Sequence, residues 1–349
     1  MSDPATISRR IPLTSAFLTP TGVQGRSALR VHVVGALLVF ASGVAFSTKA
    51  VLVKLAYRQG VDSVSLLTLR FGFSAPFFAF GAFGGRLSPR LGNPSPAPLT
   101  RRDVLAVIGL GVLGYYAASL TDFIGLRYIS AGLERLILFV YPTLVVVLET
   151  ILFKTRLVRR QIWALVITYA GIALAFRGEL GTYGSNVARG AAWVFCCALT
   201  YGLYLIGAGR MVPKLGSRRF TSLALLAAAG AVAVHAALVG AKLFGLPPAV
   251  YAIGLVMAVL ATVLPAFLLA QGIALIGSGP AAIISTVGPV STILLAYVFL
   301  QESLSATELA GTALVLFGAT LVAWRSQASP PDPLPNAPNA ATTAPPLGG

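Results

Sequence analysis

Charged residues are scarce in this 349-residue chain, where Asp, Glu, Lys and Arg together make up 10% of the sequence. Soluble domains carry about 25% charged residues, whereas hydrophobic residues account for 56% of this chain. So little charge excludes an ordinary soluble globular domain and indicates a membrane protein.

Cysteine and histidine are also scarce, with 2 residues each. Cys196 and Cys197 are adjacent within an apolar run, so we expect small buried core residues rather than a disulfide framework or a metal site. The sequence has no HExxH, GxSxG or phosphate-loop motif, which disfavours a membrane-embedded enzyme and ATP hydrolysis. We therefore expect a protein that is not an enzyme and has no cofactor.

Long apolar runs are what the chain has in abundance. A helix needs roughly 20 apolar residues to cross the hydrocarbon core. Ten runs come near this length, and they predict an all-α membrane protein with ten transmembrane helices. We expect disordered tails at 1–30 and at the Pro- and Ala-rich stretch 326–349. The ten runs lie near 33–56, 63–83, 104–124, 131–153, 160–177, 187–208, 220–240, 250–273, 280–300 and 306–324.

Basic residues are unequally divided between the two sides of the predicted membrane. If the amino terminus is cytoplasmic, the segments on its side hold 17 Lys and Arg residues and those on the other side hold 6. Cytoplasmic segments carry this excess, so both termini are expected in the cytoplasm and the chain in the cell inner membrane. The net charge of +16 therefore reflects topology, and the expected partner is the lipid bilayer rather than nucleic acid.

The chain repeats itself, because segment 125–176 aligns without gaps on segment 272–323. Two halves, 31–178 and 186–325, then hold five spans each, and an odd number of crossings inverts the second half. Two inverted five-helix repeats are typical of secondary transporters, with a substrate site between the halves, and disfavour a channel. The matched small residues and prolines are Gly125 with Gly272, Gly132 with Gly279, Pro142 with Pro289, Gly171 with Gly318 and, at a larger offset, Gly35 with Gly190.

Several runs in this order resemble the drug/metabolite transporter superfamily, specifically its EamA-type ten-span transporters. They are FSTKAVLVKLAYRQGVDSVSLLTLRFGF, LFVYPTLVVVLE and GPVSTILLAYVFLQESLSATELAGTALVLFGATLV, and the resemblance covers about residues 33 to 325. It implies movement of small metabolites through a central cavity. In that family the fourth and ninth spans usually close with a glutamate. Glu302 fills this place in the second half, whereas Thr155 stands at the matching place in the first.

Five charged side chains stand out inside the predicted spans, namely Lys49, Arg70, Asp122, Glu134 and Arg135. Lys49 lies about 24 Å into the first span at 1.5 Å per residue, so it is the strongest candidate for substrate binding or gating. Arg70 is expected to be a structural anchor or pairing residue.

Glu134 and Arg135 are neighbours that point about 100° apart on a helix, so they are not expected to pair with each other. The expected partners are Lys49 for Glu134 and Asp122 for Arg135, and Arg135 is also able to reach the interface. Two roles stay open for the pair, an interhelical ion-pair lock near the outer gate or binding of substrate or a proton.

Uncharged polar residues predict a cavity lining, and helix breakers predict where the spans are interrupted. Pro142, Gly288 and Pro289 are expected to free backbone carbonyls near the midplane. The candidate lining residues are Tyr115, Tyr116, Tyr201, Tyr204, Gln271 and Thr286.

The charges inside the spans favour one function over its rivals. Three are positive and two negative, which favours a small anionic or zwitterionic substrate such as an amino acid or organic acid, exported by alternating access. Proton coupling is expected through Glu134. The alternative is a multidrug exporter of cations, in which Glu134 rather than Lys49 is essential. The oligomeric state is left open.

Overall fold

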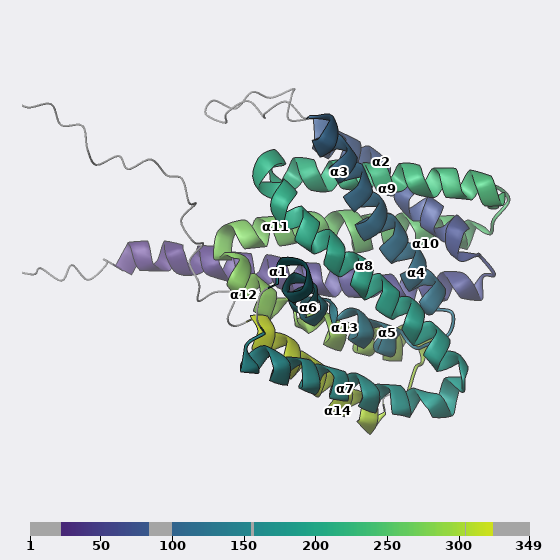
Figure 1. Ribbon diagram of the computed structural model, residues 1–349. Coiled ribbons are helices and arrows are strands. Elements are labelled where there is room, and N and C mark those ends of the chain that lie inside the picture. Colours follow the sequence, from purple (N-terminus) through teal and green to yellow (C-terminus); the bar gives the residue numbers. More distant parts are fainter. Residues whose placement is uncertain (1–21, 84–99, 155–156, 304, 324–349) are drawn as a thin grey trace, which may run out of the picture.

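A computed structural model describes residues 22–83, 100–154, 157–303 and 305–323 (Figure 1). These residues form helices and no strands. The helices of the first half are α1 (Gly22–Arg58), α2 (Ser63–Phe83), α3 (Arg101–Gly111), η2 (Val112–Ala117), α4 (Ala118–Gly125), α5 (Ala131–Leu138), α6 (Tyr141–Phe153) and α7 (Arg159–Tyr183). Those of the second half are α8 (Asn186–Leu215), α9 (Ser217–Val239), α10 (Pro248–Ala258), η3 (Val259–Val263), α11 (Leu264–Ile276), α12 (Ser278–Ile284), α13 (Val287–Leu295), η4 (Ala296–Leu300) and α14 (Ala306–Ala323).

Eight helical stretches of the described chain are long and apolar enough to cross a membrane. Two shorter apolar helices, Val287–Leu300 and Ala306–Leu321, follow them. The eight are Arg30–Arg58, Ser63–Phe83, Arg101–Gly125, Ala131–Phe153, Arg159–Gly181, Asn186–Leu215, Ser217–Val239 and Pro248–Ile276.

The amino-terminal boundary differs from the expected one. Helix α1 begins at Gly22, so the prediction of disorder over 1–30 is wrong for 22–30. Residues 1–21 and the predicted tail 326–349 lie outside the described residues. Once a helix is nucleated, each further residue adds a hydrogen bond, so α1 extends beyond the apolar run to Gly22.

Close backbone contacts at glycines hold the long helices together. Helices α7 and α14 lie side by side along one flank (Figure 1). A Cβ added to Gly171 of α7 would lie 2.7 Å from the carbonyl oxygen of Gly311 in α14, and one added to Gly311 would lie 2.6 Å from that of Gly171. Without a hydrophobic driving force in lipid, this close approach of backbones supplies the packing energy.

Two further crossings use the glycines that the sequence alignment pairs. Helix α1 meets α11 where Gly35 and Gly272 face each other, and α4 meets α8 where Gly125 and Gly190 do. A Cβ on Gly272 would lie 3.0 Å from the Gly35 oxygen, and a Cβ on Gly125 would lie 3.0 Å from the Gly190 oxygen. Each crossing therefore joins one helix from each half of the chain.

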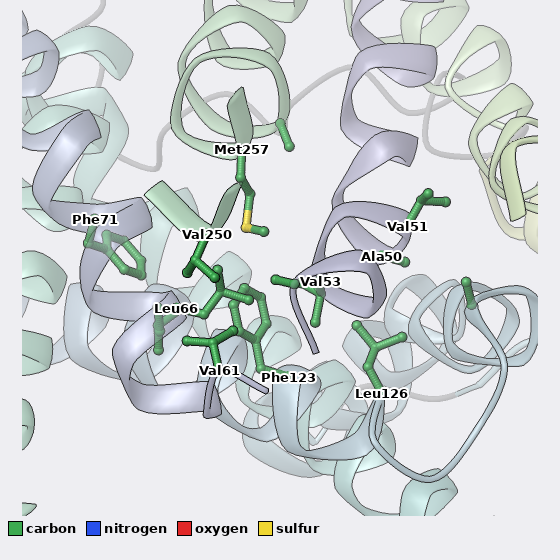
Figure 2. Close-up of a cluster of buried hydrophobic side chains, with 14 of the residues drawn as sticks. Ala50, Val51, Val53, Val61, Leu66, Phe71, Phe123, Leu126, Val250 and Met257 are labelled. Atoms are coloured by element: carbon green, nitrogen blue, oxygen red, sulfur yellow. The ribbon is translucent and has the colours of Figure 1, made fainter. Parts of the chain in front are cut away.

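A hydrophobic core fills the end of the bundle where α1 finishes, which we call the Arg58 end. Figure 2 shows Val53 of α1, Leu66 of α2, Phe123 of α4 and Val250 of α10 turned toward one another. Leu66, Val53, Phe123 and Val250 are each fully buried. This core fixes α1, α2 and α4, which carry Lys49, Arg70 and Asp122 of the site described below.

Two helices are interrupted before a proline, where the sequence predicts breaks. Helix α5 ends at Leu138 and α6 begins at Tyr141, so Pro142 occupies the first turn of the new helix. Likewise α12 ends at Ile284 and α13, which contains Pro289, begins at Val287. Proline has no N–H, so it ends one hydrogen-bond ladder and is tolerated in the first turn of the next.

Candidate functional site

A buried ion cluster links three helices near the middle of the chain's long first span. The Lys49 Nζ of α1 lies 2.6 Å from Asp122 Oδ2 of α4 and 3.1 Å from Glu134 Oε1 of α5. The exposed fractions of the three residues are 5%, 1% and 0%. The expected pairing of Lys49 with Glu134 is confirmed. The expected pairing of Asp122 with Arg135 is wrong, because Lys49 occupies that carboxylate.

Arg135 is buried and faces the interior instead of reaching the interface. Its residue is 7% exposed, and its guanidinium lies over the Phe46 ring at 4.9 Å. Helix α5 packs against α1, α8 and α13, which leaves the side chain no path to the membrane surface. Among the described residues no carboxylate lies within ion-pair distance of it, and its Nε has no hydrogen-bond partner. Arg135 therefore has no direct ion-pair partner among the described residues.

Arg70 of α2 is the second guanidinium of the site. Its Nε donates a hydrogen bond to Thr262 Oγ1 at 2.8 Å, and its Nη1 donates to Ser119 Oγ at 3.4 Å. It also lies over the rings of Phe71 and Phe123. These neutral partners orient the guanidinium, and within the described chain no carboxylate is ion-paired with it.

A cavity of about 290 Å³ lies beside these charges, with all but Glu134 on its wall. Aromatic side chains from α1, the α5–α6 break and α8 form much of the remaining wall. They are Phe46, Phe139, Tyr141 and Tyr201, together with Tyr115 from η2. A space of this size, with two guanidinium groups and an aromatic wall, is suited to one small molecule with an anionic group.

Four predicted lining residues do not reach this cavity. Tyr116 bonds through its hydroxyl to His235 Nδ1 at 3.0 Å, because it points about 100° away from Tyr115. Tyr204 lies behind Tyr201, bonded to the Tyr115 hydroxyl at 2.9 Å. These tyrosines support the wall from outside.

The other two misplaced residues lie on α11 and at the α12–α13 break. Gln271 is exposed, because the adjacent Gly272 is the residue that packs on α1. Thr286 is half-buried and donates its hydroxyl to the Ile283 oxygen at 2.7 Å, while Ser285 lines the cavity in its place. Of the two cysteines, Cys197 is buried on the wall and Cys196 is exposed, so the expectation of burial is wrong for Cys196.

Gly288, predicted as a helix breaker, is where α13 makes room for the guanidinium. A Cβ on Gly288 would lie 2.6 Å from Arg135 Nη2. The Gly288 oxygen also accepts a hydrogen bond from Ser47 of α1 at 2.9 Å. A single glycine thus brings the second half against both α1 and the guanidinium.

A second cavity, of about 720 Å³, opens at the Arg58 end. On its wall, Glu302 accepts a hydrogen bond from the Ala131 N–H at 3.0 Å and pairs with Lys54 at 2.9 Å. Glu179 accepts from the Ser130 N–H at 3.1 Å. Two carboxylates therefore hold the positive end of α5. Glu179 was not among the predicted site residues, because its partner is distant in the chain and no local sequence signal marks it.

Metal binding has no support in the part of the chain that the structure describes, where no group of three or more His, Cys, Asp or Glu side chains is arranged to hold an ion.

Comparisons with known proteins agree on one family. The sequence matches the model of the EamA-like transporter family over residues 33–177 and 188–324. It is 28% identical over 307 residues to "Uncharacterized transporter YcbK" of Bacillus subtilis, covering 86% of this chain and 96% of that protein. It is 27% identical over 320 residues to "Uncharacterized transporter sll1319" of Synechocystis, covering 84% and 94%. A solved crystal structure shares the fold with a TM-score of 0.56 at 16% identity, over 82% of this chain and 94% of that one.

Proposed function

Because this chain belongs to the EamA-like transporter family, we propose that it is a secondary transporter that exports a small anionic or zwitterionic metabolite. An amino acid or an organic acid fits this description. The metabolite crosses the cell inner membrane by alternating access between two halves of the chain. A proton gradient drives this transport, and Glu134 binds the coupled proton.

The observation that carries the substrate class is the unpaired guanidinium of Arg135. Its residue is 7% exposed, it lies on the cavity wall, and no carboxylate of the described chain is paired with it. A buried charge without a partner is costly. A carboxylate on the substrate removes this cost with charge-assisted hydrogen bonds, for which a guanidinium is the best donor.

A cationic drug is the weaker candidate. The two carboxylates beside the cavity, Asp122 and Glu134, are both engaged by Lys49. A cation has to displace this ammonium and also approach Arg70 and Arg135. The arrangement therefore disfavours the multidrug alternative.

Alternating access is supported by features that recur 147 residues apart. The π-helical segments begin at Val112 and Val259, and the helices after the two proline breaks both end in a left-handed residue, Lys154 and Gln301. The glycine crossings α1–α11 and α4–α8 are likewise matched. We infer ten spans in two inverted five-helix repeats, with Val287–Leu300 and Ala306–Leu321 completing the second repeat.

The Arg58 end is the closed outer side in this proposal, since the positive-inside distribution places it outside the cell. Bonds between the halves gather there. Lys54 pairs with Glu302 at 2.9 Å, and Arg58 Nη2 donates to the Leu300 oxygen at 2.8 Å. These bonds must break when the outer side opens.

The test is counterflow into liposomes that contain the purified protein, with labelled amino acids, organic acids and cationic dyes. Arg135→Gln should reduce counterflow of the anionic or zwitterionic substrate about tenfold to a hundredfold, since a charge-assisted hydrogen bond contributes about 1.5–3 kcal/mol. Arg127→Gln is the control, because Arg127 lies over Tyr57 at the Arg58 end.

A second variant displaces the guanidinium without removing it. Gly288→Ala places a methyl group against Arg135 Nη2 and should also weaken counterflow. Movement of cationic dyes alone, unchanged in Arg135→Gln, would exclude the proposal in favour of multidrug export.

A further inference from the structure

The ion cluster contains more acceptors than its single lysine satisfies. Lys49 binds Asp122 Oδ2 at 2.6 Å and Glu134 Oε1 at 3.1 Å. The other oxygen of each carboxyl group, Asp122 Oδ1 and Glu134 Oε2, is buried and has no hydrogen-bond partner within the described residues. The two carboxyl groups lie close to each other, because both bind the same Lys49 ammonium. Two carboxylates repel at this separation, whereas a carboxyl group and a carboxylate form a strong hydrogen bond.

Charged and titratable groups from several helices face this pair. Lys49 comes from α1, Arg70 from α2 and Arg135 from α5, next to Glu134 itself. Cys197 faces the cluster from α8, and Tyr141 and Tyr201 face Arg135. The triad of Lys49, Asp122 and Glu134 carries a net charge of −1 when both acids are ionised. One added proton makes it neutral.

We propose that Asp122 and Glu134 form one shared proton site, and that a proton bound there breaks the ion pair between Glu134 of α5 and Lys49 of α1. We call this ion pair the latch. The proton comes from the bulk aqueous phase through the cavity and binds a Glu134 carboxyl oxygen. Neutral Glu134 gives up its longer bridge to Lys49 and donates its O–H toward Asp122, which keeps the shorter bridge. No other bond changes.

Helix α5 is the element that such a latch controls. It is 8 residues long and is bounded by the turn at Ser130 and by the break after Leu138. Lys49–Glu134 is its ion pair to α1 in the middle of the bundle, while Glu179 and Glu302 hold its first residues. Breaking the Lys49 bridge frees the segment that carries Arg135. This inference rests on the proposed proton coupling through Glu134, but its test uses no substrate.

The first measurement is an infrared titration of the purified protein in nanodiscs, from about pH 9 to about pH 5, a range that includes documented buried carboxyl groups. The C=O band of protonated carboxyl groups should grow as the pH falls, and Glu134→Gln should lack the part of this band that belongs to Glu134. Asp122→Asn removes the neighbouring negative charge and should shift the band by at least about one pH unit toward acid. Asp103→Asn, which removes a surface acid paired with Lys214 at 3.5 Å, should leave the band unchanged.

The second measurement is hydrogen exchange of residues 131–138, expressed as protection relative to an unstructured chain at the same pH. In the parent, protection should fall at least about tenfold as the band appears, since local opening is read directly by exchange. In Glu134→Gln it should be low at every pH, and in Asp103→Asn it should follow the parent.

Three results would overturn the inference. The absence of a pH-dependent carboxyl band in the parent would remove the proton site. A band of undiminished intensity in Glu134→Gln would assign the proton elsewhere. Protection of 131–138 that does not change while the band appears would remove the latch. Each result is independent of whether counterflow finds an anion, so the failure of the proposed function would be recognised separately.

Discussion

The two halves of the chain differ most at α5 and α12, which open their fourth and ninth apolar stretches. Helix α5 carries Glu134 and Arg135, whereas the residues 147 positions later are Ala281 and Ala282 of α12. Lys49 has Tyr204 as its counterpart at the offset that matches Gly35 with Gly190. Glycine crossings and helix breaks recur in both halves, but the ion cluster of Lys49, Asp122 and Glu134 comes entirely from the first. A frame whose crossings and breaks recur can therefore hold a one-sided chemical site.

The largest effect should come from removing the charge that differs between the halves. Lys49→Met leaves Asp122 and Glu134 buried without their cation, and loss of one partner of a buried ion pair costs about 3–5 kcal/mol. Tyr204→Phe, the counterpart change, removes only the 2.9 Å bond to Tyr115 and should cost about 0.5–1.5 kcal/mol. Thermal unfolding in detergent measures both.

A rescue variant separates charge from packing. Lys49→Met combined with Asp122→Asn and Glu134→Gln should recover a large part of the lost stability, because the two buried carboxylates that Lys49 neutralised are gone as well. If the triple variant were no more stable than Lys49→Met alone, the cluster's role would be packing rather than charge.

An intermediate effect should be equal in both halves. Gly125→Ala places a methyl group 2.5 Å from Val194 Cγ2, and Gly272→Ala places one against Val39. Overpacking of this kind costs about 1–3 kcal/mol, and matched crossings predict matched losses in apparent Tm. A clear loss in only one of the two variants would break the comparison. Gly109→Ala, at a glycine with open space around it, is the control.

The smallest effect concerns a helix cap that only the first half has. Asp62 accepts hydrogen bonds from the N–H groups of Val64 and Ser65, both at 2.9 Å, whereas α9 starts after Gly216 without a side-chain cap. Asp62→Ala should cost about 0.5–2 kcal/mol, and Ser217→Ala should cost nothing measurable.

The same cap has a pH dependence. Partial burial raises the pKa of Asp62, but the hydrogen bonds from Ser65 and Val64 outweigh it and hold this pKa below its ordinary value. The cap's stabilisation is therefore present at neutral pH and is lost as the pH falls below about 4 through the folded-state pKa. The stability difference between the parent and Asp62→Ala should shrink over this window, and a difference that stays constant would contradict the assignment.

Some of the site was predictable from sequence because depth in an apolar run is a local property. Lys49, Arg70, Asp122, Glu134 and Arg135 stand out as charges inside spans, and all five are buried. Tyr115 and Tyr116 show the limit of such reasoning. Both are polar and at the same depth, but which one faces the cavity depends on how η2 is rotated against its neighbours, and this rotation is set by packing.

The sequence by itself determined the membrane setting, the family resemblance, the positions of the proline breaks and the small residues of the helix crossings. All of these follow from composition and from short-range rules of backbone chemistry. Only the tertiary structure decided that Lys49 pairs with Asp122 as well as with Glu134. It also decided that Arg135 has no carboxylate paired with it among the described residues. Those choices depend on distances between side chains that are 73 and 85 residues apart in the chain, and no local pattern encodes such distances.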